Sequence, residues 1–155
     1  MDAYLILRTS WVYSARLKSG FVQKVLAWAR QNEVLRVVED QVSCPTWARI
    51  LAEVTGLLIA KGGDQLNDYF KSQSGIYHVA GKGSASRFEW AGAILALDSQ
   101  REEHIAKRIE PALSSEFPTP ATRPAYSVLS CNRFEDKFGL RIPDWKESLQ
   151  FAMAE

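Results

Sequence analysis

Residues 34–61 carry the pattern that decides the fold, and they read VLRVVEDQVSCPTWARILAEVTGLLIAK. The segment 34–38 is rich in β-branched residues and bounded by charged ones, which is typical of a strand. A loop follows over residues 39–44, and Pro45 suits the first turn of a helix that two glycines end. This stretch therefore predicts one strand–loop–helix unit.

The same alternation continues on both sides of this unit. It predicts strands at 4–8, 75–80 and 105–110, and helices at 20–31, 64–71, 86–97, 132–138 and from 143 onward. Ser86 and Glu89 have the spacing of a capping box, which marks the start of one of these helices. Four prolines between 111 and 127 predict a segment without regular structure. Strands that alternate with helices predict an α/β fold with mostly parallel pairing.

The composition bounds the class of protein. With 155 residues, 46% of them hydrophobic, the chain suits one domain with a real core. A net charge of +1 gives no electrostatic reason to expect nucleic acid or an anionic membrane as partner. Its two cysteines, Cys44 and Cys131, predict reduced thiols, and no clustered His/Cys pattern predicts a metal site. We expect a soluble, cytoplasmic protein.

A turn at residues 81–86, GKGSAS, has two interpretations. It nearly matches the dinucleotide fingerprint, and Glu110 follows at about the expected offset of ~20 residues. A cofactor pyrophosphate would then lie at the N-terminus of the next helix. The alternative is a tight turn capped by Ser86, because the third position of the fingerprint should be Gly or Ala.

Two further candidate sites follow predicted strands, where ligands bind in open α/β sheets. Trp11 and Tyr13 could form the wall of a pocket against a base or a sugar, or they could pack in the core. Residues 41–46 could contact an anion, or they could serve only as the entry to a helix.

The segment with four prolines, residues 111–127, is called the proline-rich loop here. It contains Arg123, which can form a bidentate contact with phosphate. Its alternative is a rigid connector with a solvated arginine. We expect His78 to be a core histidine and His104 to be solvated. Cys44 lies beside a helix N-terminus, which could lower the pKa of its thiol, although no pattern supports a cysteine nucleophile.

Five stretches of this sequence, taken together and in order, resemble one family. They are LRTSWVY at 7–13, LRVVEDQ with Pro-Thr at 35–46, GIYHVAG at 75–81, FPTPATRP at 117–124 and the segment 138–145. The family is the dTDP-4-dehydrorhamnose reductases, which are extended short-chain dehydrogenases/reductases. Its members reduce dTDP-4-dehydro-L-rhamnose to dTDP-L-rhamnose for cell-surface polysaccharides.

The resemblance implies that the whole chain, residues 1–155, is the substrate-binding C-terminal half of a Rossmann-like enzyme. The family binds NADPH or NADH in its N-terminal portion, and a Tyr-x-x-x-Lys pair provides the acid. No tyrosine of this sequence has a lysine four positions later. We therefore expect no cofactor on this chain alone and no catalytic residue within it. A non-catalytic nucleotide-sugar-binding or regulatory module of the same fold is the alternative.

The resemblance also assigns candidate substrate-binding residues. Trp11 and Tyr13 would line the sugar end of the pocket, and Arg123 would approach the nucleotide diphosphate. The side of the pocket would be shaped by Gln41, Pro45 and Thr46. The expected partners are a dTDP-sugar and either the missing N-terminal half or a second copy, which would pair with an exposed strand edge.

Overall fold

The computed structural model describes residues 3–17 and 19–155. Its strands are β1 (Leu5–Arg8), β2 (Val12–Tyr13), β3 (Val34–Val38), β4 (Val42–Ser43), β5 (Thr46–Trp47), β6 (Gly75–His78), β7 (Ala85–Ser86) and β8 (Arg108–Ala112). Its α-helices are α1 (Phe21–Ala29), α2 (Ala48–Gly62), α3 (Leu66–Ser72), α4 (Arg87–Leu97), α5 (Asn132–Phe138) and α6 (Trp145–Ala154). Within the described ranges, no helix has the length and hydropathy that crossing a membrane requires.

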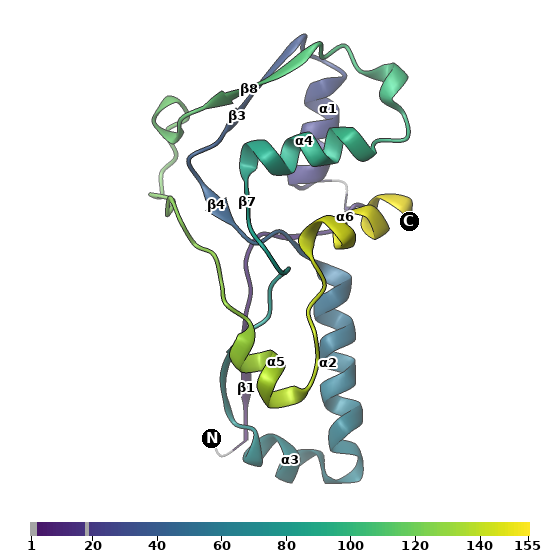
Figure 1. Ribbon diagram of the computed structural model, residues 1–155, viewed down its shortest axis with the longest axis vertical. Helices are drawn as coiled ribbons and strands as arrows, with labels where there is room; N and C mark the ends of the chain where they lie inside the picture. The colour runs from purple at the N-terminus through teal and green to yellow at the C-terminus, as the bar shows by residue number, and fades with distance from the viewer. Residues whose placement is uncertain (1–2, 18) are drawn as a thin grey trace.

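Short parallel strand pairs organise the two ends of an elongated molecule (Figure 1). At one end β3 pairs with β8, and at the other β1 pairs with β6, both in parallel. Two smaller pairs, β2 with β5 in parallel and β4 with β7 antiparallel, join the ends near the middle. The structure therefore confirms the predicted α/β class with mostly parallel strands.

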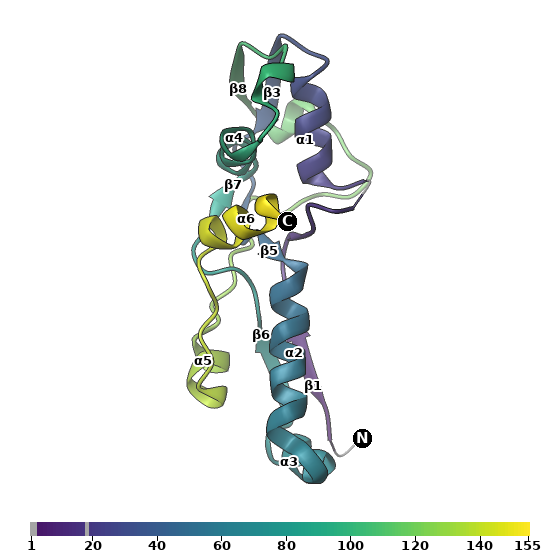
Figure 2. The ribbon, with the colours of Figure 1, turned by 90° about the vertical axis from the view of Figure 1, so that its right-hand side faces the viewer.

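One core lies at the β3–β8 end, where α1, α4 and α6 gather (Figure 2). The side chains of Leu35 and Val37 alternate inward from β3, as the period of a strand requires. They meet apolar residues of the three helices, among them Val25, Trp90 and Leu149, each almost wholly buried. This core fixes the position of α4, whose first turn carries Arg87.

A second core lies at the β1–β6 end. Tyr77 of β6 packs edge-on against Phe134 and Phe138 of α5, with ring centroids 6.4 and 5.0 Å away. Val54 and Leu58 of α2 complete the cluster, four residues apart on one face of that helix. On the opposite face of the strand pair, Ile6 and Ile76 are exposed.

The predicted helix start at Pro45 is wrong. Helix α2 begins at Ala48, because Thr46 and Trp47 are extended and pair in parallel with Val12 and Tyr13. Pairing with a distant segment thus overrides the local preference of proline for a first helical turn.

The predicted irregular segment from 111 to 127 is also partly wrong. Pro111 lies within β8 opposite Val37, and residues 114–116 form a 3₁₀ turn. Strand β8 has a paired neighbour only on the β3 side among the described residues, and proline is tolerated on such an edge strand. The helix ends were predicted better, since the capping box of Ser86 and Glu89 is present as expected.

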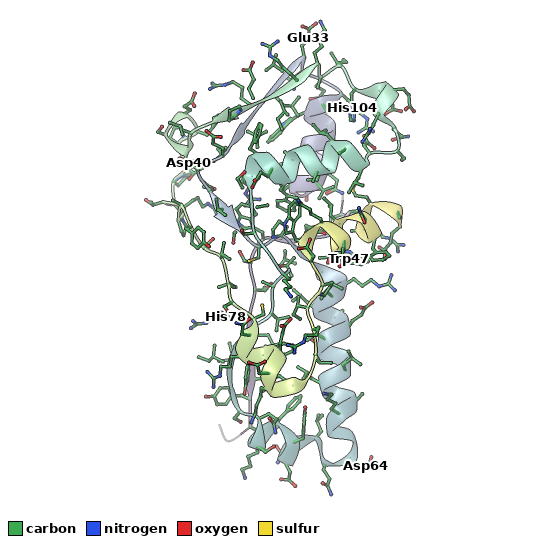
Figure 3. The ribbon with its side chains drawn as sticks, viewed as in Figure 1. Glu33, Asp40, Trp47, Asp64, His78 and His104 are labelled. Carbon is green, nitrogen blue, oxygen red and sulfur yellow. The ribbon has the colours of Figure 1, made fainter. Side chains whose placement is uncertain are left out.

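The prediction that His104 is solvated is wrong. Its Nε2 lies 2.7 Å from a carboxylate oxygen of Asp98, and only 13% of its side chain is exposed. Asp98 also accepts a hydrogen bond from Arg30 at 3.0 Å, so this cluster ties the C-terminal ends of α1 and α4 together (Figure 3). The charged neighbours at 101–103 suggested solvation, but the side chain of His104 instead pairs with Asp98, six residues earlier.

Candidate functional site

A cavity of about 640 Å³ opens between α1, β3 and the proline-rich loop. Figure 2 shows this loop, in pale green, running beside α1. The cavity is lined by Phe21, Trp28, Asn32, Val34, Leu35, Arg36, Val37, Val38, Gln41, Arg87, Phe117, Thr119 and Arg123. Its volume lies within the range of roughly 300–1,000 Å³ that is usual for small-molecule sites, and its lining is mostly apolar with a few cations.

Of the three arginines that line this cavity, Arg36 is paired with Glu116, and the other two come from different elements. Arg87 stands in the first turn of α4, and Arg123 comes from the proline-rich loop. Burial lowers the pKa of Arg87 to about 10, and the nearby charge of Arg123 acts in the same direction. Among residues 3–17 and 19–155, neither arginine forms an ion pair with a carboxylate. The cavity therefore favours an anionic ligand.

Hydrogen bonds at the end of β3 hold the start of the proline-rich loop. The carboxylate of Asp40 accepts the Ser114 N–H at 2.9 Å and the Ser114 hydroxyl at 2.6 Å. Gln41 lines the cavity and donates from Nε2 to the same hydroxyl at 2.8 Å. Asp40 lies at the bend between β3 and β4 in Figure 3.

A second contact ties the loop to the middle of β3. Arg36 donates to the Glu116 carboxylate at 2.6 Å, and the other oxygen of Glu116 accepts the N–H of Leu113 at 2.8 Å. These two bonds, the backbone one first, lower the pKa of Glu116. Together with the Asp40 bonds, they hold residues 113–116 beside β3, and the chain beyond them contributes Phe117 and Arg123 to the cavity lining.

The structure brings Gln41 and Arg123 to the cavity lining but not the other candidates, and substrate binding by Gln41 and Arg123 stays a prediction. Tyr13 is 4% exposed, and burial raises the pKa of its hydroxyl. Pro45 and Thr46 are buried as well, and Thr46 Oγ1 accepts the N–H of Gly81 at 3.1 Å. Direct contact of these residues with a ligand remains a prediction.

Trp11 lies behind the cavity rather than in its lining. Its ring stacks on the buried Trp90 at a centroid distance of 5.6 Å, and the Arg87 guanidinium lies 3.7 Å from its centroid. Trp11 therefore packs against the core in this structure, and its direct contact with a ligand stays a prediction. No pattern in the sequence singles out Arg87 as a site residue, because only the fold brings Trp11 beneath it.

Comparisons with known proteins identify the family of this chain. A family model described as the RmlD substrate binding domain matches residues 1–155. The chain belongs to this family. A dTDP-4-dehydrorhamnose reductase of Sinorhizobium fredii is 41% identical over 147 residues, which cover 94% of this chain and 47% of that protein.

Solved structures of relatives share the fold. A dTDP-4-dehydrorhamnose reductase of Clostridium acetobutylicum matches 97% of this chain and 48% of its own, with a TM-score of 0.80 and 32% identity. The reductase of Bacillus anthracis, solved in complex with NADP, matches with a TM-score of 0.79 and 30% identity over the same shares. This RmlD substrate-binding domain thus spans about half the length of the curated relatives it matches.

The turn at 81–86 of this RmlD domain does not fit a dinucleotide. The Gly81 and Lys82 N–H groups donate to Thr46 Oγ1 and to the Pro143 carbonyl, at 3.1 and 3.0 Å. At the helix start, the Ser86 and Arg87 N–H groups are also bonded within the protein. A phosphate would find these donors occupied, so the structure supports the interpretation as a packed turn.

The two cysteines and His78 differ in their burial within this RmlD domain. Cys44 is wholly buried, and burial raises the pKa of its thiol, contrary to the expected effect of a helix N-terminus. Both Cys44 and Cys131 are free thiols. His78 of β6 is only half-buried, so it is not the core histidine that the sequence predicted, and its Nδ1 lies 3.2 Å from the Ser130 carbonyl oxygen.

Proposed function

We propose that this domain binds the nucleotide-sugar substrate of a dTDP-4-dehydrorhamnose reductase. The complete enzyme would reduce dTDP-4-dehydro-L-rhamnose to dTDP-L-rhamnose for the synthesis of cell-surface polysaccharides. One observation carries the proposal: in a chain of this family, the cavity of about 640 Å³ holds Arg87 and Arg123 without a carboxylate partner among the described residues. A diphosphate carries the charge that these side chains would compensate.

The rest of the cavity suits the other parts of a nucleotide sugar. Trp28 and Phe117 are partly exposed aromatic side chains in its lining, and such rings stack on a nucleobase or a sugar face. The amides of Asn32 and Gln41 offer hydrogen-bond donors and acceptors at the same cavity. The tight loop bonds around Asp40 would keep this wall in place when the ligand binds.

Reduction requires a hydride, which a nicotinamide cofactor supplies when bound. The residues of the 81–86 turn do not fit such a group, and no tyrosine of the sequence has a lysine four positions later. We therefore propose that this domain binds and orients the sugar nucleotide, while hydride and proton transfer rely on residues outside it. A non-catalytic nucleotide-sugar module would bind dTDP equally well but would give no substrate-dependent NADPH oxidation in the complete protein.

Replacing Arg123 by alanine should weaken dTDP binding by about 1.5–3 kcal/mol, the range for hydrogen bonds to charged groups. Titration calorimetry of this chain with dTDP measures the change. Arg101→Ala is the matched control, because Arg101 is an exposed arginine outside the cavity. Equal dTDP affinity in the wild type and in Arg123→Ala would remove Arg123 from the site.

We also propose a partner for the β1–β6 pair. Ile6 and Ile76 are in register on one face, 47% and 38% exposed, and no further strand pairs with either outer edge among the described residues. An apolar strand pair with open edges is a template for another chain. The partner would be the segment that continues this sheet in the longer relatives, or a second copy when this chain is alone.

Self-association should therefore weaken when Ile6 is replaced by lysine. Sedimentation equilibrium over a range of concentrations should show dimers or larger species for the wild type and a shift toward monomer for Ile6→Lys. Ile105→Lys, at an apolar site that is 51% exposed and away from this strand pair, should behave like the wild type. A wild-type chain that stays monomeric at high concentration would contradict the second-copy proposal.

A further inference from the structure

Arg87 occupies an aromatic cage at the inner wall of the cavity. Its guanidinium carbon lies 3.7 Å from the ring centroid of Trp11, 4.8 Å from that of Phe21 and 5.5 Å from that of Trp90. The rings themselves stack, with Phe21 and Trp90 4.7 Å apart between centroids. Cation–π contacts of this kind hold a guanidinium in one plane and orientation.

The cage leaves the charge of Arg87 without a counterion. Among the described residues no carboxylate lies within ion-pair distance of it, and after burial the like charge of Arg123 lowers its pKa further. Rings can stabilise a cation, but they accept none of the five N–H donors of a guanidinium as a carboxylate does. Two cations that face one cavity are more stable when an anion lies between them.

We propose that Arg87 is the second phosphate-binding cation of the site, opposite Arg123, and that Trp11 is the residue that positions it. This inference rests on the proposed function, because it assumes a nucleotide diphosphate as the ligand. The two negative charges of an esterified diphosphate match the two arginines. The rings pack against the guanidinium and leave N–H groups free to face the phosphate oxygens.

The backbone of Trp11 supports its positioning role. Trp11 has φ of 41°, in the left-handed region that bulky residues rarely adopt. Its carbonyl oxygen accepts the Thr46 N–H at 3.2 Å, which helps to hold this conformation. Such backbone strain persists only where surrounding contacts impose it, and here it places the indole beneath Arg87.

Calorimetric titration of the 155-residue chain with dTDP tests the proposal through two variants of Arg87. Arg87→Met keeps an unbranched stem among the rings but removes the charge, and Arg87→Lys keeps the charge. We expect Arg87→Met to lose at least about tenfold in dTDP affinity, and Arg87→Lys to lose less. The salt dependence of dTDP binding should become shallower in Arg87→Met only, because one fewer charge contacts the ligand.

Arg133→Ala is the matched control, since Arg133 also stacks on a ring, Tyr77, at 5.0 Å, but outside the cavity. It should bind dTDP like the wild type. Equal losses in Arg87→Met and Arg87→Lys, or wild-type affinity in both, would overturn the role of Arg87. If Arg123→Ala loses dTDP binding while both Arg87 variants keep it, only this inference fails. If the wild-type chain binds no dTDP, the proposed function fails with it.

The positioning role of Trp11 has its own readout. Trp11→Phe keeps a ring under Arg87 and should retain dTDP affinity within about threefold, whereas Trp11→Ala should lose about as much as Arg87→Met. Rescue by phenylalanine separates positioning from a specific contact between the indole and the ligand. Full dTDP affinity in Trp11→Ala would show that Arg87 does not need this ring.

Discussion

Replacing Trp90 by alanine should lower the free energy of unfolding by about 3–5 kcal/mol, the range for deleting a large buried aromatic side chain. Trp90 is 1% exposed. Its ring contacts those of Phe21, Tyr13 and Trp11, with centroids 4.7, 5.3 and 5.6 Å away. Truncation would leave a cavity between α1, α4 and β2, which these neighbours cannot fill without losing their own stacking. Urea denaturation followed by circular dichroism measures the change.

Trp28→Ala is the matched control for this prediction. Trp28 is 39% exposed and lies in the cavity lining, so its loss should cost far less stability, about 1 kcal/mol or less. Similar losses in the two variants would contradict the assignment of Trp90 to the centre of the core. Because Trp90 also forms one side of the cage around Arg87, its removal should weaken dTDP binding as well.

The helices and longer strands could be predicted from the sequence because local patterns determine them. Ser86 and Glu89 begin helix α4, and Gly139, with its left-handed backbone, ends helix α5. Both signals depend on contacts within a few residues. The pairing of Val12 and Tyr13 with residues 46–47 could not be predicted, since two-residue strands have no periodicity of their own. Because of that pairing, α2 begins at Ala48 and not at Pro45.

In the candidate site, too, local patterns point to some residues, whereas others depend on contacts with distant parts of the chain. Arg123 could be proposed from the sequence because it lies in a motif on a proline-stiffened loop, and Gln41 because it follows a strand. Arg87 was missed because its environment is built from Trp11 and Phe21, which lie more than sixty residues away in the chain. Tyr13 lies in the core rather than in the cavity lining, since a residue at a strand end can face either a ligand or the core, and here Trp90 of α4 packs against it.

Replacing Gly81 by alanine should destabilise the fold by about 3 kcal/mol or more, at or above the upper end for overpacking a filled site. A Cβ atom at Gly81 would clash with the carbonyl oxygen of Pro45 and would lie 3.3 Å from Cβ of Trp145. The first neighbour is backbone, so relief would require the segment before α2 to move. That segment pairs with β2 and receives the Gly81 N–H, so a shift would disturb both contacts.

Gly56→Ala provides the control, because Gly56 lies inside α2 and a Cβ atom there would meet nothing within 4 Å. This change should raise stability by about 0.5–1 kcal/mol, the usual gain for alanine over glycine within a helix. Gly81→Ala also decides between the two interpretations of the 81–86 turn. If Gly81 serves packing, the wild-type chain should show no NADPH binding that the variant loses. Micromolar NADPH binding to the wild type, abolished in Gly81→Ala while its fold remains intact, would make this turn the cofactor site after all.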